Sequence, residues 1–247
     1  RELNLKLNLD KSRIADRRAL LTQLDNARSE EKAYEQLDHY SRMAADMLLG
    51  SPVRDAYDLE KEDPKIRAMY GDHMGGQSLL LSRRLVEAGV PVVQAVCSAS
   101  DLAGGGGDNW DTHRDHFPKM KNRLLPVFDR SASALLTDLE MRGMLDETLV
   151  IWMGEFGRTP KINKNASRDH WPQCYSVLLA GGGVKKGFVY GKSDKHASQP
   201  EENAVTPEDL TATIYYLLGI DPKLHIYDTQ DRPLMISSGE PIFDIIA

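Results

Sequence analysis

The sequence predicts an α/β fold built on a mostly parallel sheet. Two apolar segments without alternation, residues 90–96 and 148–153, are typical of strands that are buried on both faces of such a sheet. The helical pattern of residues 75–88 ends at Gly89 and leads directly into segment 90–96, which is the order of helix, glycine and strand in a parallel αβ unit. A third apolar segment, residues 176–180, predicts a further strand.

The composition is that of an ordinary globular protein. Hydrophobic residues make up 41% of the 247 positions and charged residues 28%, which allows one large domain, or one domain with an appendage. The net charge of −6 argues against a nucleic-acid binder, because such domains usually carry a basic surface. No apolar run approaches the roughly 18 to 20 residues of a membrane helix.

The N-terminal third predicts helices. Residues 10–49 carry an apolar stripe at the helical period, and residues 53–70 predict short helices with Pro64 in a first turn. We therefore expect a helical segment over residues 1–71, packed on a main domain over residues 72–247.

Two more helices are predicted from their end signals. A long apolar stripe over residues 117–142 stops at Gly143. Thr206, Pro207 and Asp209 then supply an N-cap, a first-turn proline and a carboxylate near the positive end of a helix dipole.

The remaining segments are assigned more simply. Residues 187–191 predict a peripheral strand, residues 192–203 a polar surface loop, and residues 221–247 an irregular tail with short strands. Cys97 and Cys174 are too few for a disulfide framework, and buried free thiols are favoured over a bridge or a nucleophile.

Ligand-type side chains follow the predicted strands. In open α/β sheets, the chemistry lies outside the carboxyl ends of the strands. Three loops at such ends carry carboxylates, imidazoles and guanidiniums, namely Asp111 and His113, then Glu155 and Arg158, then Arg168, Asp169 and His170.

These residue types suit a metal site. Asp111 and His113 are two apart, so in an extended segment they project to the same side. Imidazole and carboxylate are common ligands of Zn, Mn and Fe, and a guanidinium such as Arg158 can hold a tetrahedral oxyanion. Each pair alone is more often structural, and together at one sheet edge the pairs favour a site. His116 could be a further ligand, but an exposed first-turn helix residue is favoured.

The sequence motifs of several enzyme classes are missing. The sequence has no Gly-x-Gly-x-x-Gly at a strand-to-helix junction, no Walker loop and no Gly-x-Ser-x-Gly elbow. Dinucleotide oxidoreductases, P-loop enzymes and serine hydrolases are therefore not indicated.

Several longer motifs resemble a bacterial family, domain-of-unknown-function family 1501. They are GGQSLLLSRRLVEAGVPVVQ, NWDTHRDHF, DETLVIWMGEFGRTPKIN, RDHW, LLAGGGVKKGFVYGKSD and VTPEDLTATIYYLLGID. That family in turn resembles the alkaline phosphatase and sulfatase superfamily, in the strand that precedes GEFG and in the late helix. The resemblance implies a three-layer α/β/α, alkaline-phosphatase-like fold, with the N-terminal part of that domain, and its nucleophile, absent from this chain.

The resemblance also implies a metal site. By position, Asp111 and His113 match one metal site, Glu155 matches a carboxylate of a second, and His170 matches a late metal-binding histidine. Phe156 stands where the superfamily has another ligand histidine. Residue Asp169 is expected to join the ligands of a divalent ion (Zn, Mn or Ca), and the two arginines Arg158 and Arg168 to be catalytic.

The expected function is metal-dependent hydrolysis of small phosphate or sulfate esters. The alternative is a non-catalytic binding or assembly protein with a protein partner in the cell envelope. Related proteins resemble exported ones with a twin-arginine signal, which implies a periplasmic or cell-surface location. No nucleic-acid partner and no transmembrane segment are expected.

Overall fold

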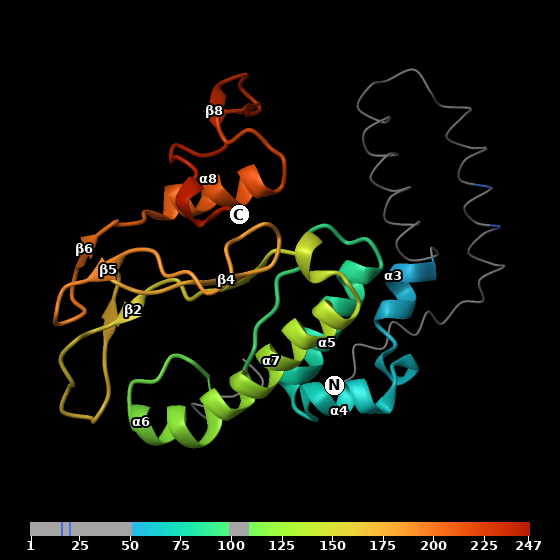
Figure 1. The fold of residues 1–247 in the computed structure, drawn as a ribbon, viewed down its shortest axis with the longest axis horizontal. Coiled ribbons are helices and arrows are strands. Elements are labelled where there is room, and N and C mark those ends of the chain that lie inside the picture. Colours follow the sequence, from blue (N-terminus) through green and yellow to red (C-terminus); the bar gives the residue numbers. More distant parts are fainter. Residues whose placement is uncertain (1–15, 17–19, 21–50, 99–108) are drawn as a thin grey trace. The chain divides into compact units, whose positions relative to one another are not determined.

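The computed structural model describes Asp16, Leu20, residues 51–98 and residues 109–247 (Figure 1). The helices predicted within residues 10–49 lie outside the described residues, apart from Asp16 and Leu20, which are helical. The contacts divide the chain into two compact units, Arg1–Ser100 with Val127–Leu135, and Asp101–Pro126 with Leu136–Ala247.

The described part of the first unit is helical. The side chain of Asp63 accepts a hydrogen bond from the Lys65 amide, and Pro64 occupies the first turn of the next helix, as the sequence predicts. Gly89 follows helix α5 (Met74–Glu87) and has a φ of 89°, in agreement with its predicted role in ending that helix. The helices are α3 (Ser51–Ala56), a 3-10 helix (Leu59–Lys61), α4 (Pro64–Tyr70) and α5 (Met74–Glu87).

Close packing at the start of α5 explains its glycines. A Cβ atom on Gly76 would lie 2.2 Å from the Tyr70 carbonyl oxygen, so only glycine allows this approach. Tyr70 and Leu80 are fully buried. From α7 (Leu125–Met141), the hydroxyl of Ser131 lies 3.4 Å from the same Tyr70 carbonyl, and this joins the helices of the first unit.

An ion network also joins α5 to the segment before α4. The side chain of Arg83 has no exposed surface and pairs with Glu62 and, at 2.5 Å, with Glu87. Arg84 reaches the same Glu62 carboxylate at 2.9 Å. Because a buried charge without its partner is costly, this network holds the register of the helices.

The second buried strand predicted at residues 90–96 is wrong. The segment is not a strand, and Val92 and Val96 are 70% and 46% exposed. The backbone of residues 92–96 makes no hydrogen bond with another described residue. Its β-branched composition predicts an extended conformation but cannot supply the partner strand that would bury it.

The long helix after the first ligand loop is confirmed. Helix α6 (His116–Lys119), a π-helical turn (Met120–Leu124) and α7 follow one another without a break, and Gly143 ends the run with a φ of 68°. Helix α8 (Pro207–Leu217) is also confirmed, and Thr206 and Asp209 form a reciprocal capping box at its start.

The strands of the second unit form antiparallel pairs. Among the described residues they make four two-stranded sheets, in which β1 pairs β4, β2 pairs β3, β5 pairs β6 and β7 pairs β8 (Figure 1). Their bounds are β1 (Val150–Trp152), β2 (Gly157–Arg158), β3 (His170–Trp171), β4 (Leu178–Ala180), β5 (Lys192–Ser193), β6 (Pro200–Glu202), β7 (His225–Tyr227) and β8 (Pro233–Met235).

The predicted α/β class, a mostly parallel sheet in a three-layer α/β/α, alkaline-phosphatase-like fold, is therefore wrong. A parallel pair needs a crossover connection, usually a helix. Between β1 and β4 the described chain has no helix and instead forms the β2–β3 hairpin, so β4 returns antiparallel to β1. The apolar run at residues 148–153 correctly predicted a strand, β1. It did not predict that the neighbouring strand, β4, runs antiparallel to it.

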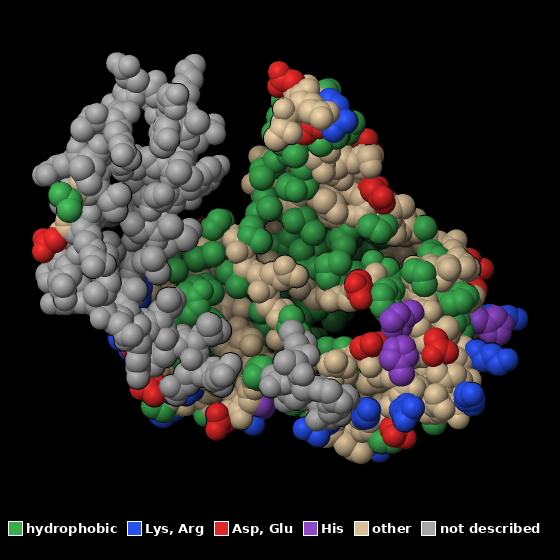
Figure 2. Space-filling model, turned by 180° about the vertical axis from the view of Figure 1, so that it is seen from behind, with side chains coloured by type: hydrophobic (Ala, Val, Ile, Leu, Met, Phe, Trp, Pro, Cys, Tyr) green, Lys and Arg blue, Asp and Glu red, His purple; other side chains and the backbone are tan. Residues whose placement is uncertain are grey.

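The peripheral segments differ from the prediction in two places. Residues 187–191 form no strand, and the polar segment 192–203 contains the β5–β6 hairpin. The β7–β8 hairpin confirms short strands in the tail. Many large hydrophobic side chains of the described residues are exposed, and Figure 2 shows such side chains, in green, at the surface. Val189 is the most exposed of them, at 87%.

Candidate metal centre

The first ligand-bearing segment is centred on a buried threonine. Thr112 is 1% exposed, whereas its neighbours Asp111 and His113 are about half exposed, with Oδ1 and Nε2 2.9 Å apart. Asn109 accepts a hydrogen bond from the Asp111 amide at 3.1 Å, and the Thr112 amide donates to the Trp110 carbonyl at 3.0 Å, so the backbone turns here. The two side chains therefore lie on the same side, as expected, although the segment is not the extended chain on which that expectation rested.

The second ligand-bearing segment is the β2–β3 hairpin. Arg158 and His170 are directly opposite each other in its register. A Cβ atom on Gly157 would lie 2.2 Å from the Cys174 carbonyl oxygen, so glycine is required in β2. The Thr159 amide donates to the Asp169 carbonyl at 2.9 Å and extends the pairing toward the loop.

The two segments meet at one carboxylate oxygen. Oδ1 of Asp111 lies 2.8 Å from Nε2 of His170 and 2.9 Å from Nε2 of His113. The ligand atoms of the three residues lie within 4.8 Å of one another, which is the geometry of a group that could hold a metal ion. All three side chains are about half exposed, at 55% for Asp111, 50% for His113 and 43% for His170.

Arg158 is the fourth side chain at this point. Its Nη2 donates to Oδ1 of Asp111 at 2.9 Å and to the Trp110 carbonyl at 3.0 Å, and its Nη1 donates to the Arg168 carbonyl at 3.3 Å. The guanidinium is only 18% exposed. It therefore links the two ligand-bearing segments through their backbones as well as through Asp111.

The electrostatics keep Asp111 ionised. The pKa of its carboxyl is lowered to about 2, mainly by the hydrogen bond from His170. Partial burial opposes this shift, while Arg158 and His113 add to it. A metal-binding carboxylate must be deprotonated, and Asp111 meets that condition over the whole neutral range.

The other predicted site residues lie at different distances from this group. Asp169 is next to it, with Oδ1 3.9 Å from Nδ1 of His113 and 3.0 Å from Nδ2 of Asn163. The guanidinium of Arg168 lies 5.9 Å from the ring centroid of Phe117. Glu155 is exposed and is not a member of the three-residue group. The catalytic and ligand roles assigned to these residues stay predictions.

Two further residues shape the site without being ligands. The Phe156 ring stacks on the His170 ring at a centroid distance of 4.2 Å. The sequence marks position 156 only as one where a ligand histidine is expected, and it does not predict this packing role. Ser167 is fully buried and donates to the Thr112 carbonyl at 2.7 Å. A single serine in a polar loop carries no sequence signal for such a role.

His116 is a first-turn helix residue. Its Nδ1 lies 2.5 Å from the Thr112 hydroxyl, and its ring packs edge-on against Phe117. Its pKa is lowered by burial first and then by the charges of Arg158 and Arg168.

Neither Cys97 nor Cys174 is in a disulfide, as the sequence favoured, but both are half-buried rather than buried. Burial raises the pKa of the Cys97 thiol, against a weaker opposing hydrogen bond with Ser131. A thiol with a raised pKa is a poor nucleophile, which argues against that role for Cys97.

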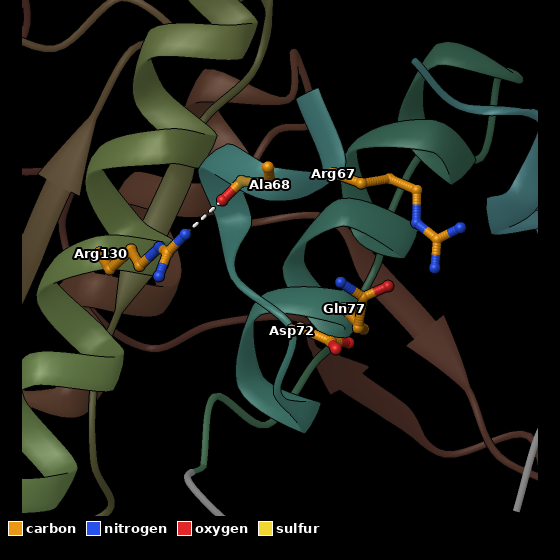
Figure 3. A pocket seen from close by; sticks show the side chains of 5 residues that line it. All are labelled: Arg67, Ala68, Asp72, Gln77 and Arg130. Atoms are coloured by element: carbon orange, nitrogen blue, oxygen red, sulfur yellow. Dashed lines mark hydrogen bonds between the residues drawn. The ribbon is translucent and has the colours of Figure 1, made fainter. Parts of the chain in front are cut away.

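The first unit has an open hollow of about 330 Å³, lined by Arg67, Ala68, Asp72, Gln77 and Arg130 (Figure 3). The Arg130 guanidinium donates to the carbonyls of Ala68 and Met69. The Gln77 amide donates to the Gly71 carbonyl at 2.9 Å. These polar groups support the backbone rather than converge on a ligand, and the arrangement around Asp111 remains the candidate site.

The fold is that of an α and β protein, with helices in the first unit and short antiparallel strand pairs in the second. Its candidate site is the surface group of Asp111, His113 and His170. The chain belongs to the family described as Protein of unknown function (DUF1501), whose model matches residues 1–246. This confirms the family that the GEFGRTP and RDHW motifs indicated. No curated protein and no solved structure matches the chain.

The family assignment does not extend to the alkaline phosphatase and sulfatase superfamily, and the antiparallel hairpins give that wider relationship no support. In the part of the chain that the structure describes, no helix combines the length and the apolar composition that a membrane span requires.

Proposed function

We propose that Asp111, His113 and His170 hold one divalent metal ion, and that the chain uses it to hydrolyse small anionic esters of phosphate or sulfate. The observation that carries the proposal is the contact of one ionised carboxylate oxygen with two imidazole nitrogens, at 2.8 and 2.9 Å. Ligands bound to one ion at 2.0–2.2 Å stand roughly 3.0–3.4 Å apart, so the Asp111 oxygen needs to separate from each of the two histidine nitrogens by only a few tenths of an ångström.

The number and exposure of the ligands support a reactive site over a structural one. Structural zinc sites are closed by four protein ligands, whereas catalytic ones have three and keep an open position. Here the group has three members, and each is about half exposed. The metal would supply a bound water of lowered pKa and polarise the ester.

The donor set also limits the metal. Ca²⁺ takes oxygen ligands almost entirely, while two imidazoles with one carboxylate suit Zn²⁺, Mn²⁺ or Fe²⁺. Asp169 lies 3.9 Å from Nδ1 of His113, so a small approach would let it accept a hydrogen bond from that ring nitrogen, as carboxylates next to metal-binding histidines commonly do.

Positive charge beside the ligands favours an anionic substrate. Arg158 is fixed next to Asp111 by a hydrogen bond of 2.9 Å. Its guanidinium would attract a phosphate or sulfate group toward the open positions of the ion.

A second function is favoured by the exposed apolar surface. Phe188 and Val189, which are adjacent in the chain, are 50% and 87% exposed, and such side chains mark protein interaction surfaces when they are contiguous. In this alternative, the chain is a non-catalytic, metal-binding assembly protein of the cell envelope, at the periplasmic or cell-surface location that the family resemblance implies.

The experiment that separates these functions measures metal binding and hydrolysis on the same samples. Calorimetric titration with Zn²⁺ and Mn²⁺ would be followed by assays with p-nitrophenyl phosphate and p-nitrophenyl sulfate. Metal binding with hydrolysis that His170→Ala abolishes supports the hydrolase. Binding without hydrolysis supports the assembly protein, and no binding contradicts both. His225→Ala is the matched control, because His225 lies on the exposed strand β7 outside the group.

A further inference from the structure

A fully buried hydroxyl joins the two ligand-bearing segments. Ser167 has no exposed surface, and its Oγ donates to the Thr112 carbonyl at 2.7 Å. Thr112 stands between the ligand residues Asp111 and His113, and Ser167 stands three residues before His170. This bond therefore ties the backbone that carries two ligands to the hairpin that carries the third.

The backbone of Ser167 is itself fixed from inside its own loop. Its amide donates to Oδ1 of Asn163 at 3.1 Å, and its carbonyl accepts from the Asn163 amide at 2.8 Å. The hydroxyl is therefore presented to Thr112 by an ordered turn.

The other connections between the two segments are weaker or more exposed. The Asp115 amide donates to the Asn165 carbonyl at 3.4 Å, which is a long hydrogen bond. Arg158 spans the segments too, but it also contacts Asp111 Oδ1, so a bound metal would compete with it there. The Ser167 side chain is neutral, makes a short hydrogen bond of 2.7 Å to the Thr112 carbonyl, and is not one of the three ligands.

We propose that Ser167 is a positioning residue that sets the metal affinity of the Asp111, His113 and His170 group. The proposal rests on the proposed function, since it requires a metal to bind there. Without the hydroxyl, the Thr112 carbonyl loses its buried donor, and a buried acceptor without a partner drives the local backbone to rearrange. Asp111 and His113 then move relative to His170, which loosens the ligand geometry. Groups that orient metal ligands typically change affinity 10- to 100-fold.

The test compares two serine variants of matched chemistry. In Ser167→Ala the bond to Thr112 is lost. In the control Ser237→Ala, a similar bond is lost, because the buried Ser237 hydroxyl donates to the Glu208 carbonyl at 2.9 Å. Zn²⁺ affinity is measured by calorimetry well below the unfolding temperature of each variant, and the d–d absorption of bound Co²⁺ reports the ligand geometry.

We expect Ser167→Ala to bind Zn²⁺ about tenfold or more weakly and to shift the Co²⁺ spectrum, while Ser237→Ala matches the parent protein. If Ser167→Ala does not fold, Ser167→Cys replaces the hydroxyl with a somewhat larger and weaker donor, and a severalfold loss of Zn²⁺ affinity is expected. Equal affinity in parent and Ser167 variants overturns the positioning role alone. A parent protein that binds no metal overturns the proposed function, and the positioning role with it.

Discussion

The Nε2 atom of His170 lies 2.8 Å from Oδ1 of Asp111, although 59 positions separate the two residues in the chain. This contact brings the hairpin and the segment around Thr112 together at a single oxygen. It is also the largest cause of the lowered pKa of Asp111.

Removal of Phe156 should weaken metal binding without removing a ligand. Its ring stacks on His170 at 4.2 Å and limits the orientations of that imidazole. We expect Phe156→Ala to lower Zn²⁺ affinity about tenfold, and Phe156→Leu to lower it less, because leucine keeps an apolar wall there. Calorimetric titration measures both. Unchanged affinity in Phe156→Ala would show that the ring does not orient His170.

Glu155→Gln should leave metal affinity within about twofold of the parent value. The resemblance to metallohydrolases implies a ligand role for Glu155, but its carboxylate is exposed and outside the three-residue group. The substitution removes only charge, so the same Zn²⁺ titration decides the matter. A second bound ion in the parent protein that disappears in Glu155→Gln would restore the two-metal site that the sequence comparison suggested.

Arg158→Ala should destabilise the second unit by about 2 kcal/mol, since charged hydrogen bonds of this kind contribute roughly 1.5–3 kcal/mol. The guanidinium joins the Trp110 and Arg168 carbonyls and is largely buried. Urea denaturation measures the change. Arg232→Ala is the control. The Arg232 side chain is 69% exposed and pairs with the nearby Asp228, so we expect its removal to lower the free energy of unfolding by at most about 0.5 kcal/mol. Equal losses in both would contradict a linking role for Arg158.

The lowered pKa of Asp111 predicts a specific acid dependence in metal-free protein. Its folded-state pKa of about 2 lies below its ordinary value of 3.8, so its contribution to stability is present above pH 3.8 and is lost as the pH falls toward 2. In Asp111→Asn, the decrease of unfolding free energy over this interval should be shallower. Denaturant titrations at several pH values between 2 and 5 measure it, and identical slopes would show that the carboxylate is not held by its neighbours.

The sequence predicted helices better than sheets for a physical reason. Helices such as α8 depend on local signals, namely a capping box and a 3.6-residue apolar stripe within one segment. A sheet depends on a partner that is distant in the sequence. The apolar runs at residues 90–96 and 148–153 look alike, yet the second contains β1 and the first has no partner strand among the described residues.

The same distinction applies to the site. Asp111 and His113 could be placed on one side because their two-residue spacing is local. His170 was grouped with them from the expected edge of a parallel sheet, which the described residues do not form, and from a family resemblance, since no local pattern relates it to residues 59 positions earlier. The roles of Phe156 and Ser167 depend on tertiary contacts, the ring stack on His170 and the hydroxyl bond to Thr112, that composition and spacing do not encode.

The most direct test of the metal centre is a Zn²⁺ titration of the parent protein beside Asp111→Asn, with Asp231→Asn as the control at an exposed turn. Asparagine keeps the size of the side chain but removes the charge that a ligand of this kind supplies. We predict one ion per chain for the parent and for Asp231→Asn, and an affinity lower by at least about a hundredfold for Asp111→Asn. No binding by the parent, or equal binding by Asp111→Asn, would contradict a metal site at Asp111, His113 and His170.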